Sequence, residues 1–247
     1  AVAFWLLAWH VVSLCVGSEL VLVSPVKVVQ TLFTVIFDPD FLKTVWYSAA
    51  RILGGFFTAL TLGTVLGWVA SRFWVVETLL RPITAVIKAT PVASFIILVL
   101  LWFSGKNLSV IISMLMVFPV IYMNVLEGIR SADKKLLEMA QVFRLSVGKK
   151  LLYIYLPAVA PFFVSACSVS LGLCWKSGIA AEVIGTPDGS IGAVFYQAKI
   201  FLQTSELLAW TVVVVAVSVA FEKLFMLLLR LILKKLKMED VLNGKRA

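Results

Sequence analysis

The chain has 247 residues, of which 62% are hydrophobic and 14% charged, and its formal net charge is +9. Soluble domains carry about 25% charged residues, so this composition excludes an ordinary soluble protein and predicts an all-α integral membrane protein. The positive charge does not indicate a nucleic-acid partner, because the basic residues cluster in a few loops between apolar runs and in the C-terminal tail.

Apolar runs along the chain predict a bundle of six membrane-spanning helices. They lie near residues 1–17, 44–70, 78–103, 108–129, 158–183 and 206–232. The first run is shorter than the roughly 20 residues that a crossing requires, so we expect it to be a span truncated at its N-terminus. Between the first two runs, Ser24 and Pro25 open a stretch that ends at Phe37, and we expect an interfacial helix there.

Lysine and arginine in the loops predict how the chain is oriented, because cytoplasmic loops carry an excess of both. Three basic clusters lie on one side of the predicted bundle: Arg72 and Arg81; Arg130, Lys134, Lys135, Arg144, Lys149 and Lys150; Lys234, Lys235, Lys237, Lys245 and Arg246. The loops on the other side are acidic or mixed: Asp38, Asp40, Lys43, Lys106, Asp188, Lys199 and Glu206. Both termini and the 130–157 loop are therefore expected in the cytoplasm.

Small residues spaced by four occur in two of the predicted spans. Ala59, Gly63 and Gly67 lie in the second span, and Ser168 and Gly172 lie in the fifth. Such spacing lets two helix backbones approach closely, so it predicts tight helix packing without indicating a function.

The 131–157 loop is polar, basic and helix-forming, although it lies between two apolar spans. Asp133 is the predicted N-cap of a helix that begins at Lys134. Apolar side chains then recur at spacings of three and four residues: Leu136, Leu137, Ala140 and Phe143. Such a helix fits the groove of a soluble partner, and it fits equally well a position on the inner leaflet.

Glu138 and Ala140, followed by Ile154, Leu156 and Pro157, carry a resemblance that favours the partner. The loop resembles the EAA signature of permease subunits of bacterial ABC importers, in which Glu-Ala-Ala is followed by Gly and then by Ile-x-Leu-Pro. The resemblance implies that the loop docks on a cytoplasmic ATPase.

Two positions depart from that signature. Met139 replaces the first Ala, and Arg144 replaces the Gly that turns the chain. We expect Gly148 to make the turn instead, so that the first helix runs a turn longer. The residues expected to form the docking loop are Asp133, Leu137, Glu138, Ala140, Phe143, Arg144, Gly148, Ile154, Leu156 and Pro157.

The resemblance covers nearly the whole chain. It is carried by Leu22-Val-Ser-Pro-Val-Lys-Val, Arg51-Ile-Leu-Gly-Gly-Phe, Leu79-Leu-Arg-Pro-Ile-Thr, Leu101-Trp-Phe-Ser-Gly and Ala180-Ala-Glu-Val-Ile-Gly. These segments resemble permeases for taurine, alkanesulfonates, nitrate and thiamine-precursor pyrimidines. The resemblance implies a type I ABC importer transmembrane domain in the bacterial inner membrane. It also implies a homodimer that pairs with two cytoplasmic ATPases and one extracytoplasmic substrate-binding protein.

The chain lacks the Gly-x-x-x-x-Gly-Lys-Ser/Thr motif that cradles nucleotide phosphates. We therefore expect it not to be an enzyme and to bind no cofactor itself, with ATP and Mg²⁺ held by the partner ATPase.

Four ionisable residues lie inside the predicted spans: Arg51, Lys88, Lys176 and Glu182. Ionisable side chains at such depth are by default functional or paired. In one interpretation Lys88 and Lys176 line the pathway and lower its barrier to an anionic substrate such as a sulfonate. In the other, Arg51 or Lys176 pairs with Glu182, and Arg51 extends toward the headgroups.

Other functions remain as alternatives. A channel or secondary carrier without an ATPase has no reason to keep the 131–157 loop. A membrane enzyme would need a group of catalytic side chains, whereas the sequence has one histidine and no cluster of acidic residues. The signatures of an energy-coupling-factor scaffold are absent. Within the importer class, a thiamine-precursor pyrimidine, riboflavin or a similar metabolite is the alternative cargo.

Overall fold

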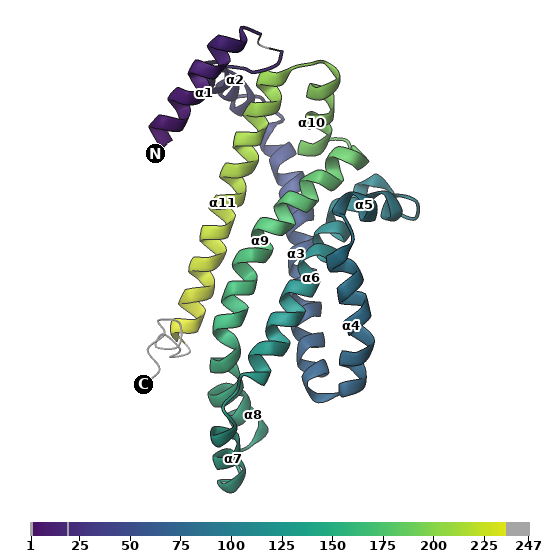
Figure 1. The fold of residues 1–247 in the computed structure, drawn as a ribbon, viewed down its shortest axis with the longest axis vertical. Coiled ribbons are helices and arrows are strands. Elements are labelled where there is room, and N and C mark those ends of the chain that lie inside the picture. Colours follow the sequence, from purple (N-terminus) through teal and green to yellow (C-terminus); the bar gives the residue numbers. More distant parts are fainter. Residues whose placement is uncertain (1, 19, 236–247) are drawn as a thin grey trace.

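The computed structural model describes residues 2–18 and 20–235, and helices dominate it (Figure 1). Within these residues four helices are long and apolar enough to cross a membrane. They are α3 (Phe41–Arg72), α6 (Gly105–Arg130), α9 (Leu156–Gly185) with the helical turns that precede it from Val147, and α11 (Thr204–Lys235). They match the spans expected at 44–70, 108–129, 158–183 and 206–232.

The span expected at 78–103 is not one straight helix. Helix α4 (Trp74–Ala89) and helix α5 (Val92–Leu100) are separated by Thr90 and Pro91, where the axis bends by 110°. Thr90 has an extended backbone because the ring of a following proline disfavours the helical conformation. Hydropathy alone does not reveal this bend, because both helices are hydrophobic.

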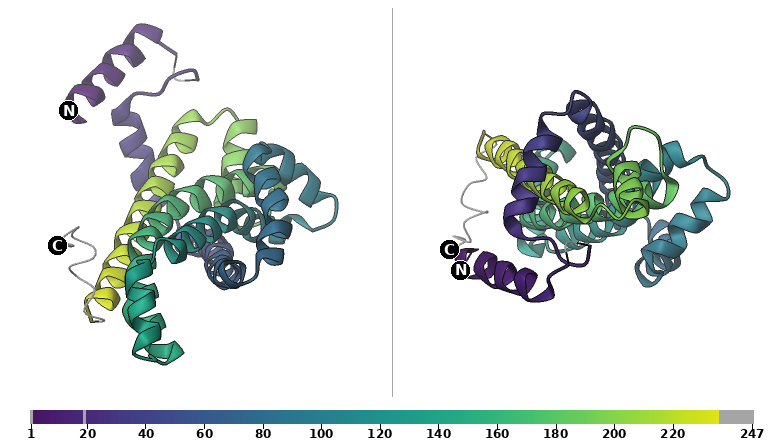
Figure 2. Two further views of the ribbon diagram at one scale, coloured as in Figure 1. Left: turned by 60° about the horizontal axis from the view of Figure 1, so that its bottom comes forward. Right: turned by 90° about the horizontal axis from the view of Figure 1, so that it is seen from above.

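The expected count of six crossings is not confirmed. The described residues give four spans, or five if α4 and α5 form one broken span. Helix α1 (Val2–Val16) has 15 residues, fewer than a perpendicular crossing needs. It meets α2 (Pro25–Ile36) and stands away from the central helices (Figure 2). Three of the basic tail residues, Lys237, Lys245 and Arg246, lie outside the described part of the chain.

Helices α3, α6 and α9 form the centre of the molecule, with α3 and α9 packed along α6. The main hydrophobic core lies among them and includes Ile52, Phe56, Ile121, Leu171 and Trp175. Helix α11 covers part of α9 and α2 and remains largely exposed.

Close contact between α3 and α6 depends on the small residues of the second predicted span. A Cβ atom added at Gly63 would lie 3.0 Å from the Ile121 side chain, and one at Gly67 would lie 3.0 Å from Val125. The expected close approach is therefore confirmed for α3. Gly172 in α9 has open space around it, so the small pair in the fifth span does not bring two backbones together.

The two ends of the bundle carry different short elements (Figure 1). One end holds α2, α5 and α10 (Ile191–Ile200), and Ser24 caps α2 as the sequence indicated. At the other end α7 (Lys134–Val142) and α8 (Val147–Lys150) project beyond the long helices. A π-helical segment, η1 (Leu151–Tyr155), then leads into α9.

Candidate coupling site and membrane-embedded charges

Helix α7 begins where the sequence predicted. The backbone N–H of Lys135 donates to Asp133 Oδ1 at 2.8 Å, which makes Asp133 the N-cap. An N-cap carboxylate satisfies a backbone donor that has no partner inside the helix and opposes the positive end of the helix dipole. The helix therefore has a fixed start directly after the end of α6.

The turn that ends α7 is made by Arg144. Its φ is 49°, and the Leu145 N–H donates to the Ala140 carbonyl at 2.9 Å while the Arg144 N–H donates to the Gln141 carbonyl at 3.1 Å. This pair of bonds is the Schellman motif, in which the residue after the C-cap takes the left-handed conformation.

The expectation that Gly148 makes this turn in a longer α7 is therefore wrong. Helix α7 ends at Val142, and Gly148 lies inside α8. The turn is fixed at residue 144 because the next residue, Leu145, packs back against Ala140 in one apolar cluster.

Ala140 attaches α7 to the start of α9. Its side chain is fully buried and packs in a cluster with Ala132, Ile154 and Ala158. Leu137 is partly buried against the same cluster. A larger side chain at 140 would push the helix away, so a small residue suits this position of the Glu138-Met139-Ala140 segment.

The opposite surface of α7 and the turn after it are exposed. Glu138 lies there, and Met139, Val142 and Phe143 are 47%, 79% and 71% exposed. The predicted apolar stripe thus divides in two, with Leu137 and Ala140 facing the chain itself and Leu136 and Phe143 facing outward. Exposed apolar side chains rimmed by charge are typical of a protein-binding surface.

The segment that joins this surface to α9 has an unusual backbone. The Leu156 N–H donates to the Leu151 carbonyl, five residues earlier, as in a π-helix. Pro157 explains the widening, because proline has no N–H for the carbonyl four residues earlier and its ring clashes with that carbonyl. Ile154 is buried against α7, while Leu156 and Pro157 are partly exposed.

Arg51, Lys176 and Glu182 are not brought together as an ion pair. The Arg51 guanidinium lies over the Tyr47 ring, 4.5 Å from its centroid, which is a cation–π contact. Lys176 is exposed on α9, and in the described residues neither cation forms an ion pair with Glu182.

Glu182 is fully buried where α3, α9 and α10 meet. The Ser48 hydroxyl donates to Glu182 Oε2 at 2.6 Å and accepts a bond from the Ile191 N–H at 2.9 Å. The Gly192 N–H also donates to Oε2, at 3.4 Å. This network fixes the start of α10 to the two long helices, so Glu182 does not lie on an exposed pathway surface in this conformation.

Lys88 lies in the last turn of α4, directly before the bend at Pro91. Its side chain is exposed, with Nζ 3.6 Å from Met123 Sδ on α6. The ammonium is favourably placed at the negative end of the α4 dipole, and Pro91 cannot donate to the carbonyl of Ile87. The break thus combines a cation with free backbone carbonyls inside a membrane segment.

Comparison with known proteins decides the family. A family model described as binding-protein-dependent transport system inner membrane component matches residues 59–238, which is most of the chain. The chain belongs to this family. The match contains the whole loop from Asp133 to Pro157, together with Lys88, Lys176 and Glu182.

Several relatives of this inner membrane component span most of its length. A putative aliphatic sulfonates transport permease protein, SsuC of Bacillus subtilis (strain 168), is 30% identical over 92% of this chain and 82% of its own. The taurine transport system permease protein TauC of Escherichia coli (strain K12) is 27% identical over 87% and 80%. The nitrate import permease protein NrtB of Synechocystis sp. is 25% identical over 79% and 73%.

The fold of this inner membrane component is also found among solved structures. The crystal structure of an amino acid ABC transporter with histidines matches it with a TM-score of 0.55 and 16% identity. The match covers 78% of this chain and 96% of that one. It confirms the expected all-α permease fold.

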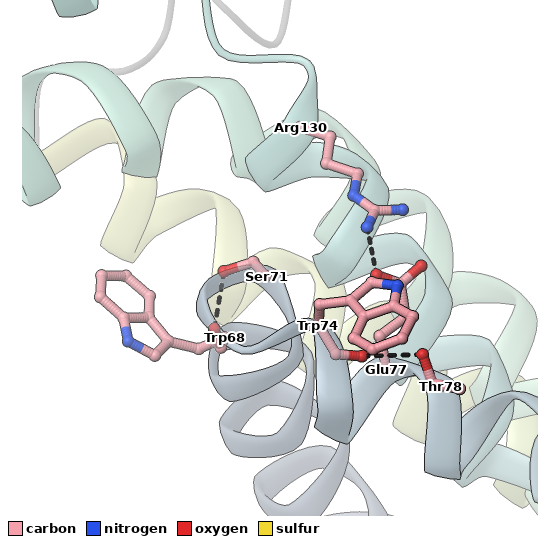
Figure 3. A network of polar contacts seen from close by, with 6 residues as sticks. All are labelled: Trp68, Ser71, Trp74, Glu77, Thr78 and Arg130. Carbon is pink, nitrogen blue, oxygen red and sulfur yellow. Dashed lines mark hydrogen bonds and ion pairs between the residues drawn. The ribbon is translucent and has the colours of Figure 1, made fainter.

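Two contacts of charged side chains in this inner membrane component were not predicted from the sequence. The Arg130 guanidinium at the end of α6 donates to the Glu77 carboxylate in the first turn of α4 (Figure 3). The acidic side chain in a first turn and the basic one in a last turn were visible signals, because both complement helix dipoles.

The second group lies on α11. Ser168 Oγ donates to Glu222 Oε1 at 2.9 Å, and these residues line a cavity of about 430 Å³ together with Lys223 and Arg230. The signal in the sequence is the adjacent Glu222 and Lys223 inside an apolar run.

Proposed function

We propose that the chain is the membrane-spanning permease subunit of an ATP-driven importer, and that it forms the substrate pathway as a homodimer. Two cytoplasmic ATPases would dock on the exposed surface of α7, and one extracytoplasmic binding protein would deliver substrate at the opposite end. The observation that carries the proposal is the geometry of the docking loop, residues 131–157, which we call the coupling loop from here on. One side of α7 is fixed to α9 through Ala140, and the other presents Glu138, Met139 and Phe143 beyond the bundle.

The connections of α7 suit transmission of a movement. Its N-terminus follows α6 after three residues, and its C-terminal side packs on Ile154 of η1 and Ala158 at the start of α9. Both helices belong to the central core, so a displacement of α7 is passed to the middle of the bundle. ATP binding on the partner would draw the two loops together and open the pathway outward, and hydrolysis would reset it.

The cytoplasmic assignment of this end rests on its charge. Arg72, Arg130, Lys149 and Lys150 lie at the α7 end of the bundle, in keeping with the excess of basic residues in cytoplasmic loops. We place the end of α11 on the same side, and the N-terminus with it on the condition that α1 belongs to a sixth span.

The substrate we propose is a small organic anion such as a sulfonate. The printed names of the relatives include transport of aliphatic sulfonates, taurine and nitrate. Lys88 and Lys176 supply exposed cations within the membrane segments. Arg51 is a weaker candidate, because its guanidinium is engaged with Tyr47.

The test is ATPase activity in proteoliposomes that contain this chain with the ATPase and binding protein encoded beside it. Ligands would include taurine, longer alkanesulfonates, nitrate, a thiamine-precursor pyrimidine and riboflavin. We expect one liganded binding protein to stimulate hydrolysis and Glu138→Lys to return it to the basal rate. Glu127→Lys is the matched control, because it makes the same charge change on an exposed side chain of α6.

Two results would overturn the proposal. If no ATPase co-purifies with the chain, a channel or secondary carrier becomes the better explanation. If Glu138→Lys and Glu127→Lys leave equal stimulation, the exposed surface of α7 is not the docking surface.

A further inference from the structure

An apolar groove lies beside the coupling loop, between the ends of α3 and α6 and the η1–α9 segment. It has a volume of about 560 Å³, and its lining includes Thr64, Trp68, Ile129, Leu152 and Tyr155. The Thr64 hydroxyl donates to the Leu60 carbonyl at 2.6 Å, so it is already satisfied. Such a groove offers a polar group little compensation for lost hydration, and it therefore suits hydrocarbon.

A second cavity of about 510 Å³ adjoins this groove and shares Trp68 and Tyr155 with it. It is lined in addition by Ser71, Arg72 and Lys150. Neither Arg72 nor Lys150 forms an ion pair in the part of the chain that the structure describes. Two cations without acidic partners therefore lie at the mouth of an apolar groove.

Trp68 and Tyr155 mark the boundary between the two cavities. Their rings meet edge to face with centroids 6.2 Å apart. Tryptophan and tyrosine concentrate at the level of lipid headgroups, where one part of the ring is apolar and the other is hydrated. Figure 3 shows that Trp68 points away from Glu77, whose carboxylate is paired with Arg130.

The depth of the groove suits one leaflet. Thr64 and Arg72 are eight residues apart on α3, which corresponds to about 12 Å along a helix. Half of the hydrocarbon core of a bilayer is about 15 Å thick. An acyl chain that starts near Arg72 would therefore follow the groove through most of its leaflet.

We propose that these two cavities bind one anionic phospholipid. Its phosphate would lie between Arg72 and Lys150, and one acyl chain would lie along Trp68, Leu152 and Tyr155. The cations alone would also attract a free anion, but the continuous apolar groove behind them selects a lipid. Basic pockets between helices on the cytoplasmic side are a recognised form of lipid site.

The position of this lipid site gives it a consequence for the coupling loop. Lys150 is the last residue of α8, and Leu152 and Tyr155 belong to η1, which joins α8 to α9. A bound lipid would support the π-helical turn from the membrane side, while α7 supports it from the other side through Ile154. The site takes its membrane orientation from the proposed function, but it does not depend on transport itself, because lining residues and charge define it.

The first experiment measures lipid retention by native mass spectrometry. The full chain is purified in mild detergent with phosphatidylglycerol or with phosphatidylcholine of the same acyl chains. We expect phosphatidylglycerol to be retained preferentially and the double variant Arg72→Gln/Lys150→Gln to reduce that retention about tenfold or more. Lys134→Gln/Lys135→Gln is the matched control, because it removes two exposed cations from α7 and should leave retention unchanged.

Three outcomes would overturn the site. Two are equal retention of the two lipids and an equal loss in both double variants. The third is found by adding glycerol phosphate in place of lipid, and is its retention as strongly as phosphatidylglycerol. The last outcome would identify an anion site without a role for the groove.

The second experiment identifies the occupant of the groove while Arg72 and Lys150 are left unchanged. A benzophenone amino acid replaces Leu152, which is 40% exposed in the groove, and is photoactivated in membranes. Cross-links to phospholipid support the site. Cross-links to a second copy of the chain would show that the groove is an interface between copies, and would overturn it.

Discussion

Arg144 occupies a backbone conformation that most side chains avoid. With φ at 49°, its Cβ lies close to the following carbonyl oxygen, which costs an L-residue about 1–2 kcal/mol. Glycine does not have this cost, although it loses about 0.5–1 kcal/mol through the greater freedom of the unfolded chain. The family signature that this loop resembles has glycine here, whereas this chain accepts the strain because Leu145 and Ala140 fix the turn.

This strain predicts opposite effects of glycine and alanine at residues 144 and 148. We expect Arg144→Gly to be more stable than Arg144→Ala by about 1 kcal/mol, because only alanine keeps the strained backbone. At 148 we expect Gly148→Ala to raise stability by about 0.5 kcal/mol, because that residue is helical and has open space around it. Thermal unfolding of the purified variants measures both differences in stability. A fall in stability for Gly148→Ala would indicate that Gly148, and not Arg144, makes the turn.

Packing of whole elements depends on single residues where α3 crosses α6. A Cβ at Gly55 would lie 2.4 Å from the Val110 carbonyl oxygen and 2.8 Å from Ser113 Cβ, whereas nothing lies within 4 Å of one at Gly54. Backbone atoms cannot move aside as a flexible side chain can. The two helices would have to separate to admit one methyl group at residue 55.

Adjacent glycines in α3 therefore provide a matched pair of variants. We expect Gly55→Ala to destabilise the chain by about 1–3 kcal/mol, the usual cost of overpacking. Gly54→Ala should be neutral or slightly stabilising, because the site is open. Unfolding midpoints in one detergent compare the two directly. Equal changes in the two variants would mean that the α3–α6 contact at Gly55 does not set the effect, because helix propensity favours alanine at both positions.

Some elements could be predicted from the sequence because their signals are local. Long apolar runs located α3, α6, α9 and α11, and the carboxylate of Asp133 located the start of α7. The bend at Pro91 was missed because hydropathy averages over it, although proline itself was visible. Helix α10 was missed because a short helix between two spans has no periodicity that separates it from a loop.

The candidate site was predictable only in part, because its other features depend on tertiary contacts that have no local signal in the sequence. The signature residues Glu138 to Pro157 were found by resemblance, but the turn at Arg144 follows from packing between Leu145 and Ala140. The hydrogen bonds of Ser48 to Glu182 and Ile191 join residues far apart in sequence. A single serine in an apolar run carries no signal of such a contact.

Across the whole molecule, the exposed cations inside the membrane segments need an explanation. A charged side chain at the centre of a bilayer costs about 2.5–3.5 kcal/mol or more, so a cation with no acidic partner is expected to face water or protein. Lys176 is exposed on α9 and makes no ion pair in the described residues. In an importer for anions, a water-filled pathway between two copies of the chain would satisfy this cation and use its charge.

This placement predicts that Lys176→Met slows uptake of an anion. A loss of about tenfold corresponds to 1.4 kcal/mol, which lies within the attraction between two unit charges a few ångströms apart in partly hydrated surroundings. Uptake of labelled taurine or a longer alkanesulfonate by proteoliposomes, expressed per ATP hydrolysed, measures the effect. Lys176→Arg should keep most of the uptake, because it preserves the charge. Lys43→Met, at the outer end of α3 beside Asp40, is the control for charge outside the span. Unchanged uptake in Lys176→Met would remove this lysine from the pathway and leave Lys88 as the remaining candidate.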